Sequence, residues 1–276
     1  MNLHLRAPFP AITPERAGWR FLSFRWGEFQ EPVREDTEDR ELAIVVIAGR
    51  IAVTAGERRI EAGSGRSSAF DGMPEAVYLP PRTAYIVEAL DGVADVAFCE
   101  SLADPGKCGP IAHVRVEDVA IEIRGSGNAT RQINHLLPPE FPAHRLLIVE
   151  VFTPAGSWSS FPPHKHDVLD EPGEVILEEV YAYRVSRPEG FGMQRVYTRD
   201  GELDEAYAVR DSDAVLVPKG YHPFVAAHGY DCYYLNALAG DVRSMAASDD
   251  PDLAWVRRAW ESLEPDPRVP LVGRPR

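Results

Sequence analysis

The chain is divided into many short β-forming runs by clusters of glycine, proline, asparagine and aspartate. Short strands at this spacing are typical of β-sandwiches and β-barrels, not of a parallel α/β sheet. Helical periodicity is clearest over 253–263, where Asp250 can cap the first turn. We therefore predict an all-β fold with a short C-terminal helix and with strands at 20–26, 42–47, 51–54, 77–79, 85–88, 93–98, 114–123, 145–152, 175–185, 194–198, 206–209, 215–217 and 233–238.

The chain is long enough for two such β units. Its 276 residues exceed what one core usually serves. Both halves place a proline directly after an apolar strand, as AVYLPPR from Ala76 and as AVLVPKG from Ala214. The glycine-containing stretch 125–129 lies between the halves. We expect a duplicated barrel, with an N-terminal domain at 1–125 and a C-terminal domain at 126–276.

Charge limits the classes of partner. The chain has 43 acidic and 29 basic residues, a formal net charge of −14, and no run of lysine or arginine that would form a basic patch. Such a chain repels phosphate backbones and anionic lipid surfaces. We therefore expect neither nucleic acid nor a membrane as a partner.

The cellular compartment is predicted from three further features. The longest strongly apolar run, 42–48, is far shorter than the roughly 20 residues of a membrane helix. The N-terminus lacks a basic head followed by an apolar run. The chain has only three cysteines, an odd number that does not suit a disulfide framework. We therefore interpret Cys99, Cys108 and Cys232 as reduced thiols. We expect a cytoplasmic protein.

The C-terminal half contains four residues of metal-ligand type. His164 and His166 are two apart, so an extended strand presents both imidazoles on one face. Glu179 shares its strand face with Tyr181 and Tyr183, and His222 follows a glycine turn. Three imidazoles and one carboxylate suit a divalent transition metal that keeps open positions for a substrate. The alternative is a solvated Glu179 and a His222 that serves only the turn.

The arrangement of these residues resembles the metal-binding pattern of cupins: HxH, a glutamate on the next strand, then PxG and a histidine. The gap from His166 to Glu179 is longer than usual, and PKGYH is one residue tighter. The chain more specifically resembles the 5-deoxy-glucuronate isomerases of myo-inositol catabolism. This resemblance is strongest over 125–240 and rests on the segments GSGNATRQIN, FPPHKHD, LEEVYAYR, GFGMQRVYT and AVLVPKGYHPFVAAHGYDCYYLNALAG.

The resemblance implies a bicupin of two cupin-type barrels that converts the aldose 5-deoxy-D-glucuronate to the ketose 5-dehydro-2-deoxy-D-gluconate. One divalent ion (Zn, Mn, Fe and Ni all suit the set) would be held by His164, His166, Glu179 and His222 and would polarise the substrate carbonyl. The family also implies a small sugar acid as the substrate, and analogy with cupins suggests a homo-oligomer.

The remaining roles stay open between alternatives. Candidates for the catalytic base are Tyr181, Tyr183 and the loop carboxylates Glu171 and Asp170. Candidates for the cation that binds the substrate carboxylate are Arg131, Arg195 and Lys219.

The first half lacks an equivalent HxH and glutamate, so its barrel is predicted to be metal-free. The other histidines considered are interpreted as loop or core residues: His113, His135, His144 and His228. Alternative functions are a uronate ketol-isomerase acting on 4-deoxy-5-hexosulose uronate, a cupin dioxygenase and a non-catalytic sugar-binding cupin.

Overall fold

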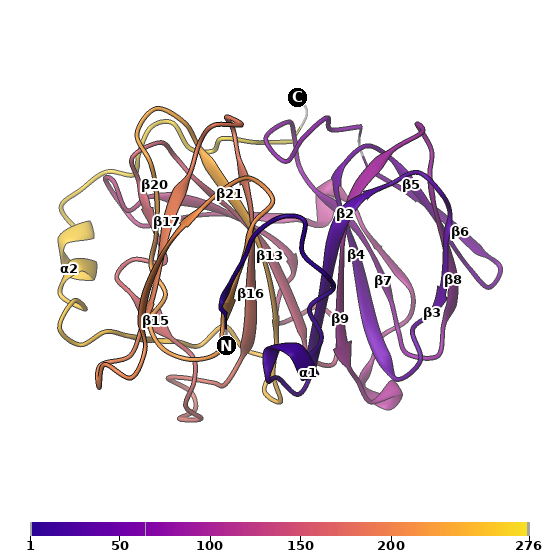
Figure 1. Ribbon diagram of the computed structural model, residues 1–276, viewed down its shortest axis with the longest axis horizontal. Helices are drawn as coiled ribbons and strands as arrows, with labels where there is room; N and C mark the ends of the chain where they lie inside the picture. The colour runs from indigo at the N-terminus through magenta and orange to yellow at the C-terminus, as the bar shows by residue number, and fades with distance from the viewer. Residues whose placement is uncertain (1, 64, 275–276) are drawn as a thin grey trace.

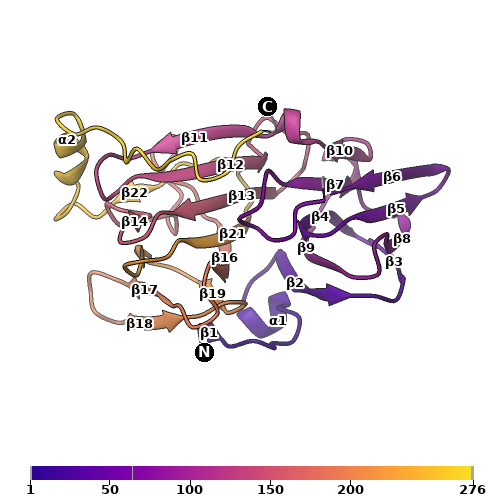
Figure 2. The same cartoon turned by 90° about the horizontal axis from the view of Figure 1, so that it is seen from above.

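Two β-barrels lie side by side in the computed structural model, which describes residues 2–63 and 65–274 (Figures 1 and 2). The first barrel pairs a five-stranded sheet, in the order β10-β7-β4-β9-β2, with a four-stranded sheet, β3-β8-β5-β6. Its elements are α1 (Pro14–Ala17), β2 (Leu22–Phe29), β3 (Val33–Asp36), β4 (Arg40–Ala48), β5 (Ile51–Ala55), β6 (Arg58–Ala62), β7 (Glu75–Leu79), β8 (Ala84–Ala89), β9 (Ala94–Leu102), the 3₁₀ turns η1 (Pro105–Lys107) and η2 (Val116–Asp118), and β10 (Ala112–Val114).

The second barrel is built around a seven-stranded sheet, in the order β1-β19-β16-β21-β13-β12-β11, and a four-stranded sheet, β14-β20-β17-β18. A two-stranded pair, β15-β22, lies beside them. The elements are β1 (His4–Leu5), β11 (Ala120–Arg124), β12 (Arg131–Leu137), β13 (Leu146–Thr153), β14 (Trp158–Ser159), β15 (His164–Lys165), β16 (Glu178–Val185), β17 (Gly192–Tyr197), β18 (Asp204–Val209), β19 (Ala214–Val217), β20 (Phe224–Ala226), β21 (Cys232–Ala239), β22 (Ser248–Asp249) and α2 (Val256–Trp260).

The all-β prediction with two barrels and a short terminal helix is confirmed. Every predicted strand range overlaps an observed strand. The range 114–123 is wrong at its centre, because the chain turns through η2 between β10 and β11. The predicted helix over 253–263 is also too long, because hydrogen bonds between residues three apart close tight turns on both sides of α2. No helix within residues 2–63 and 65–274 has the length and hydrophobicity to cross a lipid bilayer.

The two large sheets pack against each other through one continuous apolar core. Val45 and Tyr78 of the first barrel belong to the same buried cluster as Ile148, Val180 and Leu235 of the second. A separate cluster, with Ile44, Val53 and Phe98 among its members, fills the inside of the first barrel. Because strand side chains alternate between faces, β4 supplies both clusters.

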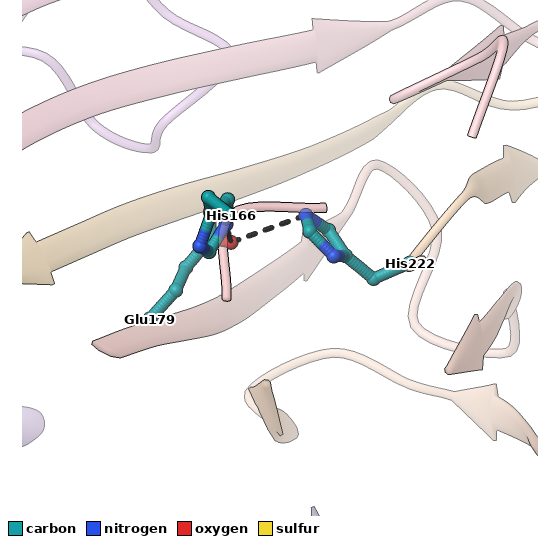
Figure 3. Close-up of side chains that lie close together, drawn as sticks. All are labelled: His166, Glu179 and His222. Carbon is teal, nitrogen blue, oxygen red and sulfur yellow. Dashed lines mark hydrogen bonds and ion pairs between the residues drawn. The ribbon is translucent and has the colours of Figure 1, made fainter. Parts of the chain in front are cut away.

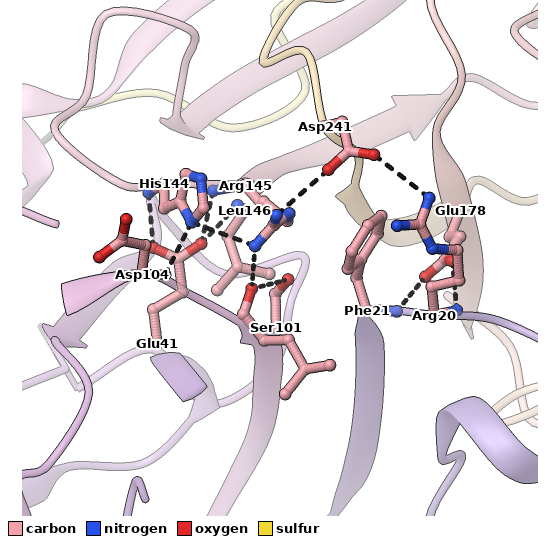
Figure 4. Close-up of polar contacts among 11 residues, drawn as sticks. Arg20, Phe21, Glu41, Ser101, Asp104, His144, Arg145, Leu146, Glu178 and Asp241 are labelled. Atoms are coloured by element: carbon pink, nitrogen blue, oxygen red, sulfur yellow. Dashed lines mark hydrogen bonds and ion pairs between the residues drawn. The ribbon is translucent and has the colours of Figure 1, made fainter. Parts of the chain in front are cut away.

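Two carboxylates accept hydrogen bonds from backbone amides across the junction of the barrels (Figure 4). Glu41 on β4 accepts hydrogen bonds from the backbone N–H groups of 144–146, just before β13. Glu178, at the start of β16, accepts hydrogen bonds from the N–H groups of 20–22. The first barrel therefore holds the ends of two strands that form the second barrel.

We propose 1–125 and 126–276 as the two domains. Two strands of the first segment complete the sheet of the second, since β1 pairs with β19 and β11 pairs with β12. The proposed boundary therefore divides the chain in sequence, but the large sheet of the second barrel contains strands from both sides of this boundary.

Candidate metal centre

A group of ionisable and polar side chains lines a cavity in the second barrel, which is bounded by β11, β12, β13, β16 and β21 and by the segment that carries Met245 and Ala247. Strand alternation places them there. On β16, Glu179 and Tyr181 line the cavity, whereas Val180 and Ala182 pack into the core shared with the first barrel.

His166 and Glu179 line this cavity, and His222 lies next to them, with one ligand atom from each of the three within 4.8 Å of the others. Nε2 of His166 is 2.8 Å from Oε2 of Glu179, and Nε2 of His222 is 3.3 Å from the same oxygen. Figure 3 shows the two imidazoles directed at the one carboxylate from different parts of the chain. All three side chains are buried.

Backbone carbonyls orient the two imidazoles. Nδ1 of His166 lies 3.1 Å from the carbonyl oxygen of Leu177, and Nδ1 of His222 lies 2.9 Å from that of Gly220. An N–H at Nδ1 donates to each carbonyl, which leaves Nε2 as the free lone pair. Gly220 has a φ of +85°, and a Cβ there would come within 2.4 Å of the Tyr197 carbonyl oxygen. This turn therefore requires glycine.

The donor set fits the divalent metal that the cupin resemblance implies. Nε2 of His222 is buried and has no hydrogen-bond partner among the described residues. A buried polar atom without a partner is costly, and a ligand bound at that atom would remove the cost. Imidazole nitrogens with one carboxylate oxygen are typical ligands of transition metals.

His164 lines the same cavity but lies outside the group of three. Its ring centroid is 4.9 Å from that of His222 and 6.5 Å from that of His166. Burial lowers the pKa of His164 well below its usual range, and the neighbouring imidazoles add to this effect. Burial also lowers the pKa of His222, to about 4. Both rings are therefore neutral at neutral pH, which is the form that binds metals.

The candidate catalytic residues occupy three different environments. Tyr181 lines the cavity, with its hydroxyl 3.0 Å from Oγ of Ser160. Burial raises the pKa of Tyr181, so its phenol is protonated at neutral pH and donates hydrogen bonds. Tyr183 does not line the cavity and donates to Oε1 of Gln194 at 2.6 Å. Glu171 is exposed in a hairpin closed by a bridge between Asp170 and Glu174, outside the cavity.

The three candidate cations for the substrate carboxylate also lie in different environments. Arg131 lines the cavity and is 3% exposed. Arg195 points outward from β17, 2.7 Å from Asp204, because Gln194 takes the inward position. Lys219 forms an exposed ion pair with Glu202 at 2.9 Å. The structure therefore brings Arg131, and neither of the other two, to the cavity.

Arg131 is buried without a countercharge. Its Nη1 donates to the carbonyl oxygens of Ala129 and Phe161, and its guanidinium stacks over Trp260 of α2. No carboxylate of the described residues lies within ion-pair distance of it. Burial lowers the pKa of Arg131 to about 10, which leaves it charged at neutral pH. A buried cation without an acidic partner is a binding site for an anion.

Other cavity residues were missing from the candidates drawn from the sequence. Half of these come from β11, β12 and α2, and no apolar period points to them because their own side chains are polar. His135 is among them. It lies on β12, four residues after Arg131 and on the same face of the strand. The missing residues are Arg124, His135, Ser160, Tyr234, Asn236 and Arg257.

Comparisons with known proteins identify close relatives. The chain matches the KduI/IolB family over residues 5–256. It is 42% identical over 249 residues to a 5-deoxy-glucuronate isomerase of Geobacillus kaustophilus, covering 89% of each chain. It is 39% identical over 224 residues to a 5-deoxy-glucuronate isomerase of Bacillus subtilis strain 168, covering 80% of this chain and 82% of the relative.

Solved structures agree with the fold. An IolB-like protein from Salmonella typhimurium LT2 superposes with a TM-score of 0.89 at 36% identity, covering 93% of this chain and 100% of that one. An oxalate decarboxylase superposes with a TM-score of 0.61 at 12% identity, covering 87% of this chain and 74% of that one. The second similarity concerns the fold alone, and it supports two cupin-type barrels.

Proposed function

The chain belongs to the KduI/IolB family, and on this premise we propose that it is a metal-dependent isomerase that converts 5-deoxy-D-glucuronate to 5-dehydro-2-deoxy-D-gluconate in inositol degradation. The observation that carries the proposal is the convergence of His166, Glu179 and His222, whose buried Nε2 makes no hydrogen bond to a described residue, beside a cavity that Arg131 lines. The names of the relatives support the choice of substrate.

We propose His164, His166, Glu179 and His222 as the metal ligands. A divalent transition ion bound there supplies a Lewis acid that polarises the carbonyl of the aldose. The hydrogen bonds of His166 and His222 to backbone carbonyls fix the tautomer that this role requires.

The other side chains bind and orient the sugar acid. Arg131 binds the substrate carboxylate, because its charge is buried and its Nε and Nη2 make no hydrogen bond to a described residue. Tyr181 keeps its proton and donates a hydrogen bond to a substrate oxygen, with Ser160 holding the hydroxyl in place. The substrate would therefore lie between a carboxylate-binding end and a metal-binding end.

Replacing Arg131 with methionine tests the carboxylate site. We expect the KM for 5-deoxy-D-glucuronate to rise about 10- to 100-fold, the range for losing a charge-assisted hydrogen bond, with a smaller change in kcat. Arg210→Met, which removes an exposed arginine, is the matched control and should leave both constants unchanged. A KM within twofold of the wild type would place the substrate carboxylate elsewhere.

The function itself is tested by incubating the purified, metal-loaded protein with 5-deoxy-D-glucuronate and following the ketose by NMR. We expect conversion to a single ketose without oxygen uptake. Oxygen uptake would favour a dioxygenase, and turnover of only 4-deoxy-5-hexosulose uronate would favour the related ketol-isomerase. Thermal stabilisation by the sugar acid without product would favour a binding protein.

A further inference from the structure

The isomerisation needs a group that removes a proton from one carbon and returns it to the next. The arginines of the cavity stay protonated. The hydroxyls of the two cavity tyrosines are engaged by serines, since that of Tyr181 lies 3.0 Å from Oγ of Ser160 and that of Tyr234 donates to Oγ of Ser159 at 2.9 Å. Glu179 and the three clustered histidines are the proposed metal ligands. Among the ionisable residues that line the cavity in the described part of the chain, His135 is therefore the remaining candidate for this group.

His135 is held as a base would be held. It lies on β12, its side chain is 17% exposed, and its Nε2 is 2.9 Å from Oε2 of Glu122 on the neighbouring strand β11. Arg124 binds the same carboxylate with Nε at 2.6 Å and Nη2 at 2.8 Å. The hydrogen bond from His135 lowers the pKa of Glu122 to about 2, so the carboxylate is ionised at neutral pH.

This pairing selects one tautomer. Because an ionised carboxylate only accepts hydrogen bonds, Nε2 of His135 carries the proton and Nδ1 is left with a lone pair. A histidine whose far nitrogen is fixed by a carboxylate is the arrangement that orients a general base. His113 has a similar partner, Glu75 at 2.8 Å, but lies on β10 in the first barrel. What distinguishes His135 is its position at the cavity.

We propose that His135 is the catalytic base of the isomerisation and that Glu122 positions it, an inference that rests on the proposed function. His135 removes the proton from C2 of the aldose. The C2–H electron pair forms the C1=C2 bond of an enediolate, and the carbonyl pair moves onto O1. The O2 hydroxyl proton then passes to O1, the electron pair left on O2 forms the C2=O bond, and the C1=C2 pair takes the proton back from His135 at C1. The substrate is rearranged without any external oxidant or reductant.

Replacing His135 with glutamine is the direct test, since the glutamine amide can still donate to Glu122. We expect kcat to fall about 100-fold or more, with KM and metal content unchanged. The acid limb of the wild-type pH–rate profile should disappear. His113→Gln is the matched control, because it removes a histidine with a carboxylate partner outside the cavity.

Replacing Glu122 with glutamine tests the positioning role with a second variant. We expect kcat to fall about tenfold. We also expect the acid limb to move to lower pH, because one negative charge facing His135 is lost while Arg124, Arg131 and Arg257 remain around the cavity. This shift is a readout that a purely structural role of Glu122 would not produce.

The outcomes separate the two proposals. A kcat of His135→Gln within threefold of the wild type would overturn the role of His135 and leave the isomerase function standing. A wild-type protein that binds metal but forms no ketose would overturn the isomerase function and, with it, the role of His135.

Discussion

Replacing His222 with alanine is expected to remove the bound metal and to lower isomerase turnover about a thousandfold or more. His222 supplies the buried nitrogen that has no other partner among the described residues, and it shares the Glu179 carboxylate with His166. Lewis-acid stabilisation of developing charge contributes several kcal/mol, and each 1.4 kcal/mol corresponds to a factor of ten in rate. Elemental analysis and the isomerase assay on the same preparation measure both effects.

The control for this variant is His228→Ala, which removes an exposed histidine from the loop that follows β20. It should retain the metal and the rate. Unchanged circular dichroism of His222→Ala would show that the barrel still folds. A His222→Ala protein that keeps one equivalent of metal and its turnover would contradict the proposed coordination.

His164→Ala addresses the ligand that lies outside the group of three. If His164 completes the site when the metal binds, the variant should bind metal more weakly and lose activity in parallel. Full retention of both by His164→Ala, together with their loss in His222→Ala, would restrict the site to the three residues that the structure groups together.

The sequence predicts the outline of the fold well because most strands have one consistently apolar face. Strand β12 is the instructive exception. Gln132 and Asn134 are completely buried on one face of β12, while Arg131 and His135 line the cavity on the other. No hydrophobic period marks such a strand. Its polar side chains are satisfied by distant partners: Gln132 binds the backbone of 271–272, and Asn134 donates to Glu150.

The same distinction, between local sequence patterns and contacts of distant segments, separates the site residues that could be predicted from those that could not. The two-residue spacing of a strand and a glycine turn are local features, and from them His164, His166, Glu179 and His222 were proposed as neighbours, of which the structure groups the last three. The choice of Arg131 over Arg195 depends on which face of β17 turns inward, which packing decides. The roles of His135 and Arg257 depend on contacts with β11 and α2, which no local pattern reports.

Replacing Glu41 with glutamine is expected to lower the free energy of unfolding by about 3–5 kcal/mol, since buried hydrogen bonds to a charged group are worth roughly 1.5–3 kcal/mol each. Glu41 is completely buried. Its Oε1 accepts the N–H groups of Arg145 at 2.6 Å and Leu146 at 2.9 Å. Its Oε2 accepts the N–H of His144 at 2.7 Å and the hydroxyl of Tyr78 at 2.8 Å. Each oxygen therefore faces two N–H or O–H donors, and Oε2 also accepts a weaker hydrogen bond from Sγ of Cys108 at 3.6 Å.

Glutamine has the shape of Glu41 but only one acceptor oxygen, so its NH₂ group would face two of these four donors. Two buried donors would lose their acceptor at the place where the first barrel holds the start of β13. Because both barrels share one apolar core, we expect the loss in a single cooperative transition, measured by urea denaturation followed with tryptophan fluorescence. Glu57→Gln, an exposed glutamate in the turn between β5 and β6, should change stability by less than about 0.5 kcal/mol. If Glu41→Gln proved equally harmless, the carboxylate at the junction would contribute shape and not charge to the docking of the two barrels.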